Sequence, residues 1–276
     1  MTAAQTSAAS LSPRSARFLG SVYAGNPGAV MARSWRATRS TNWLVMISGF
    51  LEPVLYLLSL GVGLGRLVGT IDTGGHQVGY AAFIAPALLA TSAMNGAVMD
   101  STFNVFFKLN FGKLYEGMLA TPLGPLDVAL GEIMMALLRG GVYGFAFMGV
   151  MAAVGLTLSW TALLALPALL IIAFGFASLG MGIVSFMKTF TQLDWIFFVL
   201  LPMFLLSSTF FPITVYPAPV QLIIQCLPLW HGIELVRGLT TGVITSALLW
   251  HLLYYAGMIA AGLILTTTRL KALFLK

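Results

Sequence analysis

The chain contains few charged residues for its length. Only 8% of its 276 residues are Asp, Glu, Lys or Arg, whereas 59% are hydrophobic and the mean hydropathy is +0.94. An ordinary water-soluble domain carries about 25% charged residues. The composition therefore excludes a water-soluble protein and indicates one that lies in a lipid bilayer.

Cysteine and histidine are also scarce. The single cysteine, Cys226, excludes an intrachain disulfide framework, and its expected role is apolar packing. The three histidines, His76, His231 and His251, lie in different regions of the chain and lack metal-ligand spacing. The sequence therefore predicts neither a disulfide-stabilised fold nor a metal site.

Two common catalytic motifs are absent. None of the five lysines stands in a Gly-x4-Gly-Lys-Ser/Thr loop, in which backbone amides, the Lys and the hydroxyl jointly hold phosphates and magnesium. No Gly-x-Ser-x-Gly nucleophile elbow occurs either. We therefore predict that the chain is not an enzyme and binds no cofactor of its own.

Long apolar runs dominate the sequence. A helix needs roughly 20 apolar residues to cross a bilayer, and six regions can do so. They are continuous, unlike the short alternating strands of an outer-membrane barrel. We therefore predict an all-α integral membrane protein with six transmembrane helices. The predicted spans cover about residues 43–68, 80–107, 128–156, 161–187, 194–211 and 246–268.

The region before the first span divides into two parts. Residues 1–25 are rich in Ala and Ser and are predicted to be a disordered cytoplasmic arm. Residues 26–42 are predicted to form an interfacial amphipathic helix, with Met31 and Trp35 toward lipid and arginines such as Arg36 toward water. This helix serves either as a basic membrane anchor or as a moving part.

Three prolines within residues 211–219 interrupt the helical pattern after the fifth span. The two apolar pieces that follow are separated at Pro228, and each is too short to cross a bilayer. We predict that residues 212–244 form a re-entrant pair of short helices at the outer face. With the spans they form a single membrane domain from residue 26 to residue 276.

The distribution of Lys and Arg predicts the orientation. With the N-terminus inside, most of the 14 basic residues fall on the cytoplasmic side, as the positive-inside rule requires. Both termini are then cytoplasmic. The net charge of +6 suits an anionic inner leaflet, and nothing in the sequence indicates a nucleic-acid partner.

A small set of ionisable residues lies inside or at the rim of the predicted spans: Glu52, Asp100, Glu132, Arg139 and Asp194. Each costs roughly 2.5–3.5 kcal/mol at a helix centre, so each is expected to face protein or water. Glu132 and Arg139 are seven residues apart on one helix face, and Asp100 completes a predicted network. The network either fixes helix packing or carries protons or substrate. Glu52 precedes Pro53 and is predicted to cap a kink.

A polar, proline-containing loop separates the second and third predicted spans. It covers residues 108–127 and includes the sequence from Lys113 to Leu123. A membrane protein without its own energy source needs a surface on which a soluble partner acts. This loop is the predicted coupling surface.

Several segments of the chain resemble the permeases of type-2 ATP-binding-cassette (ABC-2) exporters. The similarity is greatest to the nodulation-factor, or lipo-oligosaccharide, exporter branch, and daunorubicin-resistance permeases are more distant. It extends over residues 27–270. The segments are Leu-Glu-Pro-Val-Leu-Tyr at 51–56, Ala-Pro-Ala-Leu-Leu-Ala-Thr-Ser-Ala-Met at 85–94, Met-Leu-Ala-Thr-Pro-Leu at 118–123 with Gly-Glu at 131–132, and the stretches Phe-Phe-Pro-Ile at 210–213, Leu-Pro-Leu-Trp-His at 227–231 and Glu-Leu-Val-Arg-Gly at 234–238.

The resemblance implies a dimer of six-helix subunits, each docked on a separate nucleotide-binding ATPase subunit that holds ATP and Mg²⁺. It implies that the loop at 108–127 carries a coupling helix and that the segment at 212–244 forms an outer gate. The implied ATPase contacts are Lys113, Tyr115, Glu116, Met118, Leu119, Thr121 and Pro122. The implied outer-gate residues are Pro212, Pro228, Glu234, Arg237 and Gly238.

The expected function is that of a passive gate in a bacterial cytoplasmic membrane. Closure of the partner ATPases would move an amphipathic lipid-linked molecule, a glycolipid or lipo-oligosaccharide, or a hydrophobic drug-like molecule outward through a homodimer or a heterodimer. The alternative is an ion- or proton-coupled carrier, or an integral-membrane enzyme, that uses the buried carboxylates. Many carriers contain inverted repeats, and the sequence shows none.

Overall fold

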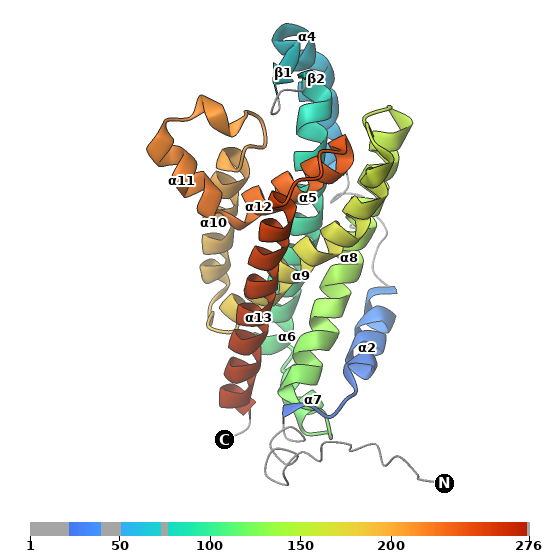
Figure 1. The fold of residues 1–276 in the computed structure, drawn as a ribbon. Coiled ribbons are helices and arrows are strands. Elements are labelled where there is room, and N and C mark those ends of the chain that lie inside the picture. The colour runs from blue at the N-terminus through green and yellow to red at the C-terminus, as the bar shows by residue number, and fades with distance from the viewer. Residues whose placement is uncertain (1–21, 40–50, 73–76, 275–276) are drawn as a thin grey trace, which may run out of the picture.

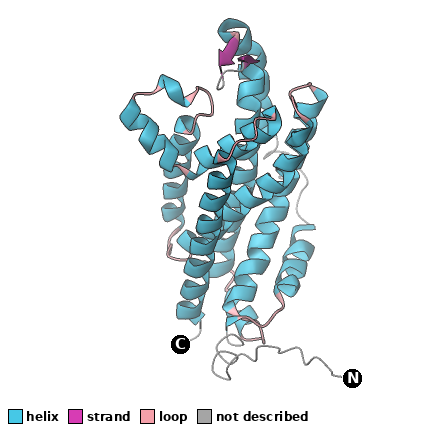
Figure 2. Cartoon of the chain, viewed as in Figure 1, coloured by secondary structure: helices cyan, strands magenta, loops and turns pink. Residues whose placement is uncertain are grey.

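Long helices make up most of the structure. The computed structural model describes residues 22–39, 51–72 and 77–274. The long helices run side by side in one bundle (Figure 1), and almost all regular structure is helical (Figure 2). This confirms the all-α class. The predicted disordered arm lies outside the described residues except for its last four positions.

Among the described residues, five helical segments are long and apolar enough to cross a membrane. The predicted span at 194–211 is shorter: the 3-10 helix η4 (Phe190–Leu193) and helix α10 (Asp194–Leu206) together do not reach the roughly 30 Å of an apolar bilayer core. Six spans therefore stay a prediction. The five long segments are Leu51–Val68, Tyr80–Asn110, Pro125–Ala153, Trp160–Val184 and Ala247–Phe274.

Helix α5 (Tyr80–Met99) is the centre of the bundle. Nearly all of its residues are buried, and it is apolar on every side, as expected of a helix surrounded by other helices. It packs against α8 (Pro125–Ala153), α9 (Ala165–Val184) and α12 (Pro228–Thr241).

The long segments contain changes of helical type. The π-helical turn η2 (Asp100–Asn104) continues α5 into α6 (Val105–Asn110), so the three form one segment. A 3-10 turn, η3 (Trp160–Leu164), precedes α9 and packs against α12. The last helix is α13 (Ala247–Phe274).

Small residues set the closest helix crossings. A Cβ atom on Gly96 of α5 would lie 2.9 Å from the Cα of Gly140 on α8. A Cβ atom on Gly262 of α13 would lie 2.6 Å from the backbone carbonyl carbon of Ser178 on α9. A larger side chain at either glycine would force the helices apart. Van der Waals packing between small residues therefore fixes these two crossings, as is common inside membranes.

The segment Leu51–Val68 ends at a small β-hairpin. Its last turns are the π-helix η1 (Leu57–Leu64) and α4 (Gly65–Val68). Strands β1 (Thr70–Asp72) and β2 (Gln77–Gly79) then pair antiparallel. The sequence analysis predicted no strands, because three residues are too few to show an alternating pattern.

Short helices follow α10, as predicted from the prolines. They are η5 (Ile213–Val215), α11 (Ala218–Cys226) and α12, which begins at Pro228. Figure 1 shows α11 in the same half of the bundle as β1 and β2. Whether α11 and α12 dip into the bilayer stays a prediction.

Helix α2 (Pro27–Arg39), within the predicted interfacial helix, lies along α8. A Cβ atom on Gly131 of α8 would be 2.5 Å from the Cβ of Val30, so the glycine allows close approach. The Asp127 carboxylate of α8 accepts hydrogen bonds from the backbone N–H groups of Ala24 and Asn26, at 2.6 and 2.9 Å. Asp127 and Gly131 of α8 therefore fix the start of α2 and the residues just before it.

The predicted charge network is correct for Asp100 with Arg139 and wrong for Glu132 with Arg139. Arg139 Nη2 lies 3.3 Å from Asp100 Oδ1, whereas Glu132 Oε2 lies 2.5 Å from Lys108 Nζ. Glu132 and Arg139 are about 10 Å apart along α8, so each meets a different level of the neighbouring segment. Two separate ion pairs, both between α8 and the segment Tyr80–Asn110, replace the predicted cluster.

Glu52 does not join either pair. It is exposed on the segment Leu51–Val68, and within the described ranges no ion pair reaches it. The turn before Pro53, which the predicted kink requires, includes residues outside the described part of the chain.

The Arg139–Asp100 pair gives a stability prediction. Arg139→Ala should lower the free energy of unfolding by about 3–5 kcal/mol, because the buried Asp100 carboxylate then has no cation. Adding Asp100→Asn removes that charge and should recover part of the loss. Thermal unfolding and folded yield in detergent measure both variants. Wild-type stability of Arg139→Ala alone would contradict a structural role for the pair.

Candidate functional site

The loop between α6 and α8 contains a short helix, α7 (Leu114–Leu119). The backbone N–H groups of Phe111 and Gly112 both donate to the carbonyl oxygen of Phe107, at 3.1 and 2.8 Å, and end α6. Lys113 then adopts a left-handed conformation with φ of 45°. Figure 1 shows α7 at the end of the bundle that also holds the C-terminal end of α13.

Helix α7 has a buried face and an exposed face. Tyr115 is 0% exposed and Met118 is 7% exposed, while Leu119 is half-buried. This i, i+3, i+4 spacing is that of an amphipathic helix packed on its own protein. The sequence analysis assigned these apolar side chains to the ATPase contact. The structure instead places Tyr115 and Met118 inside the subunit.

The exposed face of α7 and its flanks retain the other predicted contact residues. Glu116 and Lys113 are exposed, and so are Thr121 and Pro122 in the turn before α8. Phe111, just before the helix, is 68% exposed and was missed by the sequence analysis. A lone Phe in a polar loop is a weak signal, because such a residue usually turns inward.

The Tyr115 side chain lies near the two carboxylates of the ion pairs, Glu132 and Asp100. Burial raises its pKa well above the usual value, and the negative charges of Glu132 and Asp100 raise it further, against an opposing effect of Arg33. Among the described residues its hydroxyl has no hydrogen-bond partner. Tyr115 therefore lies in the electric field of both carboxylates while contributing no hydrogen bond to them.

Glu132 connects the elements around this position. Its carboxylate accepts from Lys108 Nζ of α6 at 2.5 Å and from Ser34 Oγ of α2 at 3.5 Å. One side chain of α8 thus bonds to two other elements, α6 and α2, and its charge acts on Tyr115 of α7.

The predicted outer-gate residues also come together in part. Arg237 of α12 forms an ion pair with Glu234, and its Nη2 donates to the carbonyl oxygen of Ser208 at 2.9 Å. Its Cζ lies 4.2 Å from the ring centre of Phe83 on α5. Arg237 thus ties α12 to α5 and to the turn after α10.

The other predicted outer residues have structural positions. A Cβ atom on Gly238 would lie 2.9 Å from a methyl group of Leu248, so glycine allows α12 to approach α13. Pro228 begins α12, and its carbonyl oxygen accepts from the Tyr255 hydroxyl at 2.8 Å. Pro212 directly precedes η5.

A histidine pair was missed by the sequence analysis. The Nδ1 atoms of His231 on α12 and His251 on α13 are 2.7 Å apart, and the Tyr254 ring stacks on His231 at 3.9 Å. Burial, then the nearby His251, lowers the pKa of His231 to about 4. In the described ranges no group of three or more His, Cys, Asp or Glu could hold a metal. The pair joins α12 to α13.

These features describe a helical protein that passes several times through a membrane and presents a short, well-fixed loop helix at one end. The chain belongs to the ABC-2 type transporter family, whose sequence model matches residues 28–241. This confirms the resemblance to ABC-2 permeases. Membership implies a membrane subunit of the inner membrane that works with a separate ABC ATPase subunit.

Individual relatives agree with this assignment. The chain is 35% identical to nodulation protein J of Rhizobium leguminosarum bv. viciae over 213 residues, which cover 76% of this chain and 80% of the relative. It is 31% identical to nodulation protein J of Rhizobium meliloti over 78% of this chain and 80% of the relative. It is 26% identical to the inner membrane transport permease YadH of Escherichia coli over 69% and 70%.

Burial of Tyr115 leads to a prediction that separates packing from docking. Tyr115→Ala should lower the free energy of unfolding by about 3–5 kcal/mol, because it leaves a cavity. Tyr115→Phe should leave stability unchanged or raise it by about 1 kcal/mol, because it removes a buried hydroxyl without a partner. Thermal unfolding of both variants measures this. An equal loss of stability in the two variants would contradict a Tyr115 hydroxyl without a hydrogen-bond partner.

Proposed function

We propose that the chain is the permease subunit of an ATP-driven exporter, which moves an amphipathic, lipid-linked or hydrophobic molecule outward across the cytoplasmic membrane. The chain supplies the pathway and the moving helices. ATP and Mg²⁺ bind to the partner ATPase. The N- and C-termini lie in the cytoplasm, on the same side as α7.

One observation carries this proposal: α7 has an exposed polar face and a buried face that is packed into the bundle. A soluble partner can press on Glu116 and its exposed neighbours, while Tyr115 and Met118 fix the helix to the subunit. The Glu132 contacts then transmit the displacement to α2 and α6. A rigid attachment is needed because a flexible loop would absorb the motion.

A second copy of the chain completes the pathway in this proposal. On α10 only Met203 is buried, and large apolar residues such as Phe198 and Leu201 remain exposed. One subunit has no enclosed route wide enough for a large amphiphile among its described residues, whereas two related by a twofold axis can line one. A homodimer is the simplest arrangement, and a heterodimer with a related permease would use the same surfaces.

The carrier and enzyme alternatives receive less support. Both use free buried carboxylates, yet Asp100 pairs with Arg139 and Glu132 pairs with Lys108. Each pair joins α8 to the segment Tyr80–Asn110, which supports a structural role for both carboxylates. Transport by the purified chain with a proton gradient and no ATPase would restore the carrier alternative.

Glu116 provides the test of the coupling role. Glu116→Arg should leave membrane insertion and folded yield unchanged, because the side chain is exposed. It should weaken ATPase binding and abolish ATP-dependent export, because reversing a charge in an interface places like charges together. The measurements are co-purification of the ATPase and export in vesicles.

A matched control is Asp194→Arg, which makes a similar charge change at an exposed residue that begins α10. It should retain the ATPase. Normal ATPase recovery and normal export for Glu116→Arg would remove α7 from the coupling role.

Crosslinking tests the proposed dimer. In a Cys226→Ser background, a single cysteine at Phe198 of α10 should form a disulfide with its copy in the second subunit. A cysteine at Phe145, which is also exposed but lies on α8, should not. Figure 1 shows α10 and α8 on opposite sides of the bundle. Non-reducing gels of membranes give the readout. A monomeric complex with full transport would refute the dimer.

A further inference from the structure

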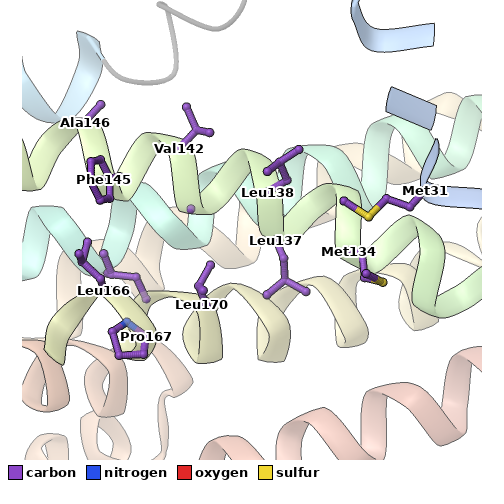
Figure 3. Close-up of a pocket in the computed structure, with 12 residues that line it drawn as sticks. Met31, Met134, Leu137, Leu138, Val142, Phe145, Ala146, Leu166, Pro167 and Leu170 are labelled. Carbon is purple, nitrogen blue, oxygen red and sulfur yellow. The ribbon is translucent and has the colours of Figure 1, made fainter. Parts of the chain in front are cut away.

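A long apolar groove runs between α8 and α9 and ends at α2. Its cavity volume is about 800 Å³. Figure 3 shows its lining side chains along the two helices, with Met31 of α2 at one end beside Met134 and Phe145 and Leu166 toward the other. Every lining residue is apolar, so the groove offers no hydrogen bond from a side chain.

The dimensions of the groove fit a linear chain. The lining residues of α8 extend from Met134 to Ala146, a rise of about 18 Å. This is more than half of the roughly 30 Å apolar core of a bilayer. Gly141 keeps the middle open, because even a Cβ atom there would lie 3.0 Å from a methyl group of Leu170. Phe145 and Val142 stay largely exposed beside it.

The α2 end of the groove has the chemistry of a headgroup region. Trp35 lies one turn after Met31 on the same face of α2 and is 47% exposed, and tryptophan favours the membrane interface. Arg33 and Arg36 of α2 are exposed, and α2 contains no acidic residue. An occupant of the groove therefore has an apolar length between α8 and α9, and its α2 end adjoins a helix that carries Arg33 and Arg36 on its water-facing side.

We propose that the groove binds an acyl chain of an anionic phospholipid whose phosphate lies by the arginines of α2. Packing against the groove wall holds the chain, since apolar burial alone gives no advantage inside lipid. The charge of α2 selects the headgroup. Because α2 packs mainly on α8, the lipid supplies a link from α2 to α9. The site does not depend on the proposed transport activity.

Native mass spectrometry of the full-length permease tests the site. Protein in detergent receives equal amounts of dioleoyl phosphatidylglycerol and dioleoyl phosphatidylcholine. Wild type should retain phosphatidylglycerol in excess. Gly141→Leu should lose most of it, because the new side chain fills the groove. Gly149→Leu is the matched control on the same helix, since a Cβ atom there meets nothing within 4 Å, and it should retain the lipid.

Ala146→Phe provides a second groove-filling variant if Gly141→Leu folds poorly, because Ala146 is exposed at the far end of the groove. It should also reduce retention of phosphatidylglycerol while keeping the wild-type thermal midpoint in lipid-free detergent. Equal lipid retention by this variant and by Gly149→Leu would overturn the groove as the binding site.

A charge variant tests the headgroup assignment. Arg36→Gln should reduce the preference for phosphatidylglycerol over phosphatidylcholine about fivefold, the effect of roughly one basic residue near an anionic surface. Lys188→Gln, at an exposed position outside α2, should leave it unchanged. Equal retention of both lipids by wild type would refute the anionic headgroup.

Discussion

The buried carboxylate of Glu132 makes the contacts on which the α7 end of the bundle depends. It lies on α8, receives Lys108 from α6 and Ser34 from α2, and has Tyr115 of α7 next to it. A charge buried in this position is costly unless it is paired. The Lys108 and Ser34 contacts therefore hold α6 and α2 to α8. Burial of Tyr115 and Met118 makes α7 part of the bundle.

Close packing between helices makes the rest of the bundle rigid. Glycines at the crossings of α5 with α8 and of α9 with α13 let backbones meet at contact distance. Well-packed helices shift as units, so a displacement at one end reaches the other. At the opposite end from α7, Arg237 ties α12 to α5 and to the turn after α10. Helix α7 contacts α6, which continues α5 through η2, so one continuous helical segment connects the two ends.

The exposed apolar surfaces divide into two kinds. On α10 they consist of large side chains such as Phe198 and Leu201, which suits contact with a second subunit. Between α8 and α9 they form a groove with glycine at its middle, which suits a flexible chain. Lipid alone gives little reason to bury apolar surface. Shape and charge therefore decide which surface meets protein and which meets lipid.

The sequence by itself determined the class of the protein and most of its long helices, because an apolar run of sufficient length has one stable form in a bilayer. It also located the polar loop at 108–127, the helix before the first span and the break at Pro228, since prolines and polar residues mark helix ends locally. The helix within that loop was implied only by the family resemblance. The family followed from short motifs spaced along the whole chain.

Only the tertiary structure decided which side chains meet. Periodicity shows that Tyr115, Met118 and Leu119 share a face of α7, but it does not say whether that face meets the subunit or a partner. The spacing of Glu132 and Arg139 gives a common helix face, but their partners Lys108 and Asp100 come from another helix. The contact of His231 with His251 likewise depends on how α12 lies on α13. The local sequence pattern shows in which direction a side chain points around its own helix axis. Whether two side chains meet depends on the relative height and rotation of their two helices. Packing across the whole bundle sets that height and rotation.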